Sequence, residues 1–154
     1  MTYNQDKITP AEIAKIPFFY DLTVENQLIL SRYITLRYLD ELRYVFKEGD
    51  KPTGIYFLLE GKVKIVKKNP DNTEELLDEL TSPQFFSEMS LIDGRRKSAS
   101  VVTLTKTKLA VLTCDNFERL EQDAPDIAID IIRKVAHTIG IKLRKASNNR
   151  EGII

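Results

Sequence analysis

The stretch from Phe85 to Val102 reads FFSEMSLIDGRRKSASVV, and its residue types point to a binding site. An apolar start leads to Glu88, a short helical turn is expected after it, and an Asp-Gly turn and a basic run follow. A carboxylate accepts hydrogen bonds from hydroxyl groups, N–H groups at the start of a helical turn point at anions, and a cation neutralises a phosphate. The stretch therefore predicts a site for a sugar and an anion close together, as in a ribose with a cyclic phosphate.

Strand patterns lie on both sides of this stretch. They show alternation of polar and apolar residues or a β-rich composition, and turn residues separate them. The run 73–80 contains Glu-Glu-Leu-Leu, which favours a helix, but its neighbours favour a strand. The predicted strands are residues 42–47, 54–59, 62–65, 73–80, 98–105 and 108–113.

Helical patterns occupy both ends of the chain, and the first forty residues are expected to be helical. Thr9-Pro10-Ala11-Glu12 is a capping box with Pro at the first helical position, and Thr23 is expected to cap a second helix. Asp115, three residues before an acidic side chain, predicts a further helix start. Residues 123–126 open the last helix, whose basic end at 142–150 is expected to be solvated. Its apolar residues recur every four positions, at Ile127, Ile131, Val135, Ile139 and Leu143.

The order of helices, strands and helices predicts a mainly β fold with flanking helices. A length of 154 residues suits one domain. We expect an N-terminal helical segment that packs on a β-roll, with a phosphate-binding segment and the final strands inside the roll, and then C-terminal helices and a tail. The expected bounds are 1–40 for the helical segment, 41–114 for the roll, 86–99 for the phosphate-binding segment, 98–113 for the final strands, 115–147 for the helices and 148–154 for the tail.

Composition excludes several classes of protein. Lys plus Arg equals Asp plus Glu at 23 each, so the chain has no bulk attraction for nucleic acid or for an anionic membrane. One Cys cannot form an internal disulfide, and one His leaves little for a metal site. No apolar run approaches the ~20 residues of a membrane span, and no signal peptide is visible. We expect a cytoplasmic protein without metal, cofactor or catalytic activity, because no nucleophile–base pair is evident either.

Four segments resemble, in order and spacing, the cyclic-nucleotide-binding domain of catabolite-activator-type regulators, of regulatory subunits of cAMP-dependent protein kinase and of cyclic-nucleotide-gated channels. They are FKEGD at 46–50, GIYFLLEGKVKI at 54–65, FSEMSLIDG at 86–94 and SASVV at 98–102. The resemblance covers roughly residues 17–144. It implies an eight-stranded antiparallel β-roll, jelly-roll-like and cupin-like, with N-terminal helices and a long C-terminal helix.

The resemblance also implies roles for individual residues. Glu88 falls where the family's Glu binds the ribose 2′-hydroxyl. Ser98 and Ala99 fall where backbone N–H groups meet the cyclic phosphate, and Leu91 falls near the apolar wall of the pocket together with Ile92. The implied ligand-binding residues are Ser87, Glu88, Met89, Leu91, Arg96, Lys97, Ser98 and Ala99.

Two positions depart from the family's pattern. Ser87 replaces the usual Gly, a residue that allows close backbone approach or angles that other residues resist. Lys97 replaces the phosphate-binding Arg, so a single ammonium group takes the place of a planar guanidinium that binds two phosphate oxygens. Losing one charge-assisted hydrogen bond costs about 1–3 kcal/mol, or roughly 5–150-fold in affinity. The guanidinium of Arg96 reaches the phosphate in place of Lys97 only if the strand shifts by one residue, because neighbouring residues in a strand point to opposite faces.

Two functions stay open on the sequence alone. One is a regulatory sensor that binds cAMP, cGMP or another ligand such as a cyclic dinucleotide, and signals through movement of the C-terminal helix. The other is a degenerate module that keeps the fold, binds no nucleotide and uses its surface to bind a protein. Either function needs an effector protein. The resemblance to the family also implies a homodimer that forms through the C-terminal helix. Direct DNA binding is not expected, because only seven residues follow Ser147 where DNA-binding relatives add a domain.

Overall fold

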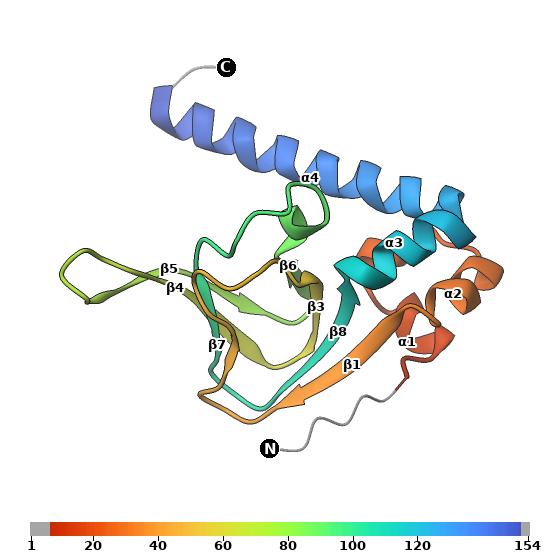
Figure 1. Cartoon of the computed structure of the whole chain (residues 1–154), viewed down its shortest axis with the longest axis horizontal. Coiled ribbons are helices and arrows are strands. Elements are labelled where there is room, and N and C mark those ends of the chain that lie inside the picture. Colours follow the sequence, from red (N-terminus) through yellow and green to blue (C-terminus); the bar gives the residue numbers. More distant parts are fainter. Residues whose placement is uncertain (1–6, 152–154) are drawn as a thin grey trace.

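The computed structural model describes residues 7–151, with side chains described through residue 148. Its eight strands form two four-stranded sheets with helices before and after them (Figure 1). The expected mainly β fold, an eight-stranded antiparallel roll with N-terminal helices and a long C-terminal helix, is confirmed. The strands are β1 (Ile34–Leu39), β2 (Tyr44–Phe46), β3 (Gly54–Glu60), β4 (Lys62–Lys68), β5 (Glu74–Thr81), β6 (Gln84–Phe86), β7 (Ser100–Thr103) and β8 (Thr107–Thr113).

The two sheets face each other across a shared core. One sheet has the order β1-β8-β3-β6 and the other β2-β7-β4-β5, and all neighbours are antiparallel. Every strand contributes a buried apolar residue to the cluster between the sheets. The Tyr56 and Phe86 rings stack there with centroids 5.2 Å apart, and Phe46 packs beside both rings.

The N-terminal helices are α1 (Pro10–Ala14), the 3-10 turn η1 (Pro17–Phe19) and α2 (Val24–Leu30). Both predicted caps are confirmed, because the Thr9 and Thr23 hydroxyls accept hydrogen bonds from backbone N–H groups of their helices. The expectation of helix through residue 40 is wrong for β1. There Ile34 and Leu36 are buried on one face, and the strand pairs with β8 along its whole length.

Two predicted boundaries also need correction. The strand expected at 98–105 is β7, and it begins at Ser100 because its ladder with β4 starts there. The helix expected to start at Asp115 is α3 (Cys114–Asp123), which is capped by Thr113 at the end of β8. The Thr113 hydroxyl accepts the N–H of Asn116 at 3.1 Å.

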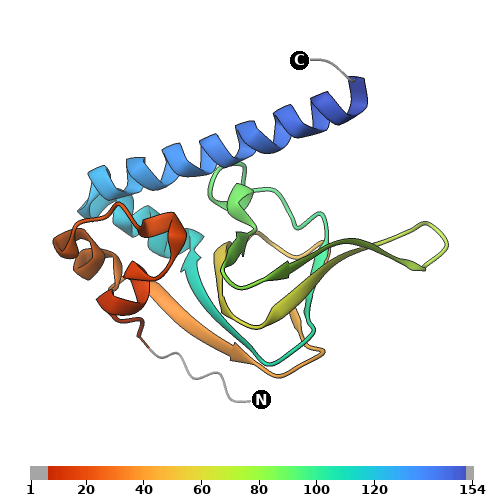
Figure 2. The same ribbon diagram turned by 180° about the vertical axis from the view of Figure 1, so that it is seen from behind.

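The last helix, α4 (Pro125–Glu151), runs from α3 across the roll, as the view from behind also shows (Figure 2). It continues through most of the tail predicted at 148–154, and residues 152–154 lie outside the described part of the chain. The predicted apolar repeat is buried through Val135, but Leu143 is 69% exposed. A strict spacing of four drifts off the face of a helix with 3.6 residues per turn. Within residues 7–151 no helix combines the length and apolarity needed to cross a bilayer.

The first half of α4 belongs to the core beneath the helices. Ile131 is fully buried there, within a cluster that also contains Phe19 and Phe57. The helices, the β1-β8-β3-β6 sheet and α4 all contribute to this cluster. We therefore expect α4 to be part of the folding unit rather than an appendage.

Replacing Ile131 by Ala should lower the free energy of unfolding by about 2–5 kcal/mol, because it leaves a cavity in a packed core. Val24→Ala is the control, since Val24 is 77% exposed and its truncation should change stability by no more than about 0.5 kcal/mol. Urea unfolding followed by circular dichroism measures both. Equal small effects of the two substitutions would contradict the placement of α4 in the core.

Candidate functional site

The segment between β6 and β7 begins with a turn at Ser87. Its backbone has φ 65° and ψ 26°, a left-handed conformation that Gly adopts without penalty and other residues rarely adopt. The 3-10 turn η2 (Glu88–Leu91) follows at once. The hydroxyls of Ser87 and Ser90 lie 3.0 Å apart across this turn. The Ser that replaces the family's Gly thus keeps the left-handed turn and adds a hydroxyl inside it.

Lys97 points into the roll. It is 8% exposed, and its ammonium donates to the Ser87 hydroxyl and, at 2.9 Å, to the Ser90 hydroxyl. The nitrogen also lies 4.1 Å from the centroid of the Phe46 ring, within the range of a cation–π interaction. Arg96 points outward, where its guanidinium donates to the Gly49 carbonyl at 2.9 Å. The structure thus places Lys97, not Arg96, on the inner side of the segment.

The Lys97 ammonium has hydroxyl partners, but among the described side chains it has no ion-pair partner. Burial lowers the pKa of its ammonium to about 8, and the nearby Asp50 carboxylate opposes this shift. Burial also raises the pKa of the Cys114 thiol, which keeps that group neutral at physiological pH. Among the described side chains no carboxylate forms an ion pair with Lys97. A buried cation of this kind attracts an anionic group.

Lys97 lines a cavity of about 330 Å³ together with most of the residues predicted for the site. The backbone N–H groups of Ser98 and Ala99 make no hydrogen bond to another residue in the described range 7–151. They are therefore free to donate to an anion beside Lys97. The predicted residues that line this cavity are Ser87, Met89, Arg96, Lys97, Ser98 and Ala99.

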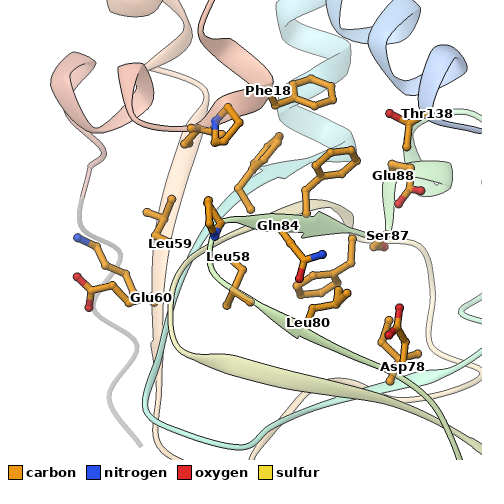
Figure 3. Close-up of a pocket in the computed structure, with 18 of the residues that line it drawn as sticks. Phe18, Leu58, Leu59, Glu60, Asp78, Leu80, Gln84, Ser87, Glu88 and Thr138 are labelled. Atoms are coloured by element: carbon orange, nitrogen blue, oxygen red, sulfur yellow. The ribbon is translucent and has the colours of Figure 1, made fainter. Parts of the chain in front are cut away.

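Glu88 lines a second, larger cavity of about 710 Å³ between the roll and α4. Glu88 is 5% exposed. Figure 3 shows Glu88 close to Thr138 of α4, with Asp78 of β5 at the same end of the cavity. Lys142 of α4 donates to the Glu88 carboxylate and is its hydrogen-bond partner among the described residues. The larger cavity thus joins a buried carboxylate to the C-terminal helix.

The two cavities adjoin, because Ile65, Phe86 and Ser87 line both. The structure therefore brings Glu88 and Lys97 to neighbouring spaces on either side of Ser87. Leu91, which was predicted to fall near the apolar wall, lines neither cavity and packs on the core beneath the helices. The apolar side chains that do line both spaces are Ile65 and Phe86.

Sequence reasoning missed the contribution of α4. Lys142 was expected to be solvated, but it reaches Glu88. A signal was present, because a helical spacing of four, three and four leads from the buried Ile131 and Val135 to Thr138 and then to Lys142. Within the described residues, no group of three or more His, Cys, Asp or Glu side chains could hold a metal ion.

Comparison with known proteins agrees with this geometry. The family model described as "Cyclic nucleotide-binding domain" matches residues 36–123, more than half of the chain. The CRP-like cAMP-activated global transcriptional regulator of Mycobacterium tuberculosis (strain CDC 1551 / Oshkosh) is 30% identical over 110 residues, which are 71% of this chain and 47% of that protein. The cAMP-dependent protein kinase type II regulatory subunit of Drosophila melanogaster is 29% identical over 126 residues, 81% of this chain and 33% of that protein.

The chain therefore spans less than half the length of these two curated relatives. Among solved structures, the Catabolite Activator Protein of Thermus thermophilus matches with a TM-score of 0.76 at 26% identity, covering 88% of this chain and 62% of that one. The matched residues include the segment from β6 to β7 that carries Glu88 and Lys97. The chain belongs to the cyclic nucleotide-binding domain family.

Proposed function

We propose that this chain is a regulatory domain that binds cAMP or cGMP in the two adjoining cavities and signals through α4. The observation that carries the proposal is that two buried charged groups line adjoining cavities on either side of Ser87. One is Lys97, a cation without a contacting carboxylate, and the other is the carboxylate of Glu88. The cyclic phosphate then lies beside Lys97 and the free N–H groups of Ser98 and Ala99. The ribose 2′-hydroxyl donates to Glu88.

The relatives support a cyclic purine nucleotide as the ligand. The Mycobacterium tuberculosis and Drosophila melanogaster relatives are both named for cAMP. The residues assigned so far contact the phosphate and the ribose, which cAMP and cGMP share, and none of them is assigned to the base. The base preference is therefore left to measurement, and cytoplasm stays the predicted compartment.

A second candidate is a module that keeps the fold and binds a protein instead of a nucleotide. It is favoured by the intramolecular partners of both charged groups. Lys97 is already bonded to two hydroxyls, and Glu88 is already bonded to Lys142. A nucleotide has to replace or share these contacts, whereas a protein ligand on the surface does not.

An apolar seam on α4 supports the proposal that the domain forms a homodimer, although Ile132 and Ile139 within it are partly buried against the core of the same chain. Its residues are spaced alternately three and four apart, the spacing that pairs helices in a coiled coil. Ile129 is 51% exposed and Leu143 is 69% exposed, so a second copy of α4 would cover them. The seam consists of Ile129, Ile132, Ala136, Ile139, Leu143 and Ala146.

Thermal unfolding with about 1 mM cAMP, cGMP or AMP tests nucleotide binding. A ligand at 100 times its Kd adds about 2.7 kcal/mol of stability, which shifts Tm by several degrees at roughly 2–4 °C per kcal/mol. We expect a shift with a cyclic nucleotide and none with AMP. Glu88→Ala should abolish the shift, measured against its own ligand-free Tm. Glu121→Ala, at an exposed position on α3, should keep the shift. No shift with either cyclic nucleotide would favour the protein-binding module.

The affinity for cAMP should fall as pH rises through about 8. The phosphate binds the protonated form of Lys97, whose pKa is about 8 because of burial. Below that pH the ammonium is already charged, and above it binding requires uptake of a proton, which costs up to about tenfold in affinity per pH unit. Calorimetric titrations from about pH 6 to about pH 9.5 measure this profile. In Lys97→Arg the profile should be flat, because Arg stays protonated, and a slope that survives this substitution would exclude Lys97 as its source.

Substitution of the seam should dissociate the dimer. Leu143→Glu or Ala136→Glu places a charge within the expected interface, so light scattering should give the monomer mass of 17.7 kDa. Ile141→Glu is the matched control, because Ile141 is 39% exposed on the same helix but lies off the seam. An assembly that survives the first two substitutions, or is lost only in the control, would place the interface elsewhere.

A further inference from the structure

The ion pair between Glu88 and Lys142 joins the ligand-binding segment to the C-terminal helix. Glu88 begins η2, and Lys142 lies 54 residues later in the second half of α4. The Glu88 side chain is 7% exposed and the Lys142 side chain 62% exposed. A long lysine side chain thus reaches inward from the surface to neutralise a buried carboxylate.

The two halves of α4 are held in different ways. In the first half Ile131 and Val135 are fully buried, and Lys134 donates to the Phe18 carbonyl at 2.9 Å. Between residues 136 and 148 no described side chain is fully buried. Within that same range the bond from Lys142 to Glu88 is the polar side-chain contact with the roll. Ile139 is partly buried against the core beneath the helices, so beyond Ile139 the position of the second half depends on this one pair.

Lys142 also occupies space that a sugar needs. It lines the larger cavity beside Glu88, so its ammonium stands where a hydroxyl group has to approach the carboxylate. The Glu88 side chain is almost fully buried, which leaves little room for a second donor at the same oxygen atoms.

We propose that Lys142 and the ribose hydroxyl compete for Glu88, so that occupation of the site releases the second half of α4. This inference rests on the proposed function, since it needs a ligand that donates a hydroxyl to Glu88. While Lys142 holds the carboxylate, α4 lies against the roll. A hydroxyl on Glu88 replaces that bond without leaving the buried carboxylate unsatisfied, and α4 is then held by its first half.

Lys145 provides a matched control on the same helix. It carries the same charge, lines the same cavity and lies three residues further along α4. Among the described residues, however, it has no carboxylate partner. Lys142→Met and Lys145→Met therefore remove the same charge from the same surface, and only the first removes the contact with Glu88.

The first arm of the experiment measures amide hydrogen exchange without nucleotide. Lys142→Met should speed exchange severalfold over residues 136–148 and leave residues 127–135 unchanged, while Lys145→Met should match the unsubstituted chain. The comparison is repeated in the Leu143→Glu background, which removes protection from pairing of two α4 helices. Unchanged exchange in Lys142→Met would overturn the tether, whether or not any nucleotide binds.

The second arm measures affinity for cAMP and cGMP by calorimetry. Removing a competitor should tighten binding by about two- to fivefold in Lys142→Met, the range for a partly exposed ion pair. Lys145→Met removes a charge from the lining of the same cavity without freeing Glu88, so it should not tighten binding. Weaker binding in Lys142→Met would overturn the competition and make Lys142 a ligand contact. If no variant binds either nucleotide, the competition falls together with the proposed function, and the exchange result shows separately whether the tether exists.

Discussion

Burial of the Lys97 ammonium is the interaction on which the arrangement of the site depends. Burying a charged group is costly unless hydrogen bonds compensate it, and here the ammonium is held by the hydroxyls of Ser87 and Ser90 over the Phe46 ring. These contacts join the loop before β7 to η2 and to β2. They also fix the left-handed turn at Ser87, which separates the space beside Lys97 from the space beside Glu88.

The second charged group of the site connects the larger cavity to α4. The hydrogen-bond partner of Glu88 comes from α4 rather than from the roll, and it lies in the half of α4 where no described side chain is fully buried. A ligand that changes the bonding of Glu88 therefore changes the free energy of one position of α4. This coupling needs no rearrangement of the β-roll, whose core is shared by all eight strands.

Local signals in the sequence predicted the parts that local chemistry decides. The caps at Thr9 and Thr23 follow from short-range spacing, and the structure has them. The inward direction of Lys97 was implied by the resemblance to the family, and the structure buries this side chain. β1 was not predicted because no Gly or Pro separates it from α2, and its pairing partner β8 lies about 70 residues away. Lys142 was missed for a related reason, since a solvated lysine and one that reaches a buried carboxylate look alike until the helix is placed on the roll.

A crystal structure of the chain with cAMP would test the central claim most directly. The account predicts the cyclic phosphate within about 2.7–3.2 Å of the Lys97 nitrogen and of the Ser98 or Ala99 N–H groups, with the ribose 2′-hydroxyl on Glu88. A nucleotide bound elsewhere, or a phosphate that contacts Arg96 while Lys97 keeps its serine partners, would contradict it.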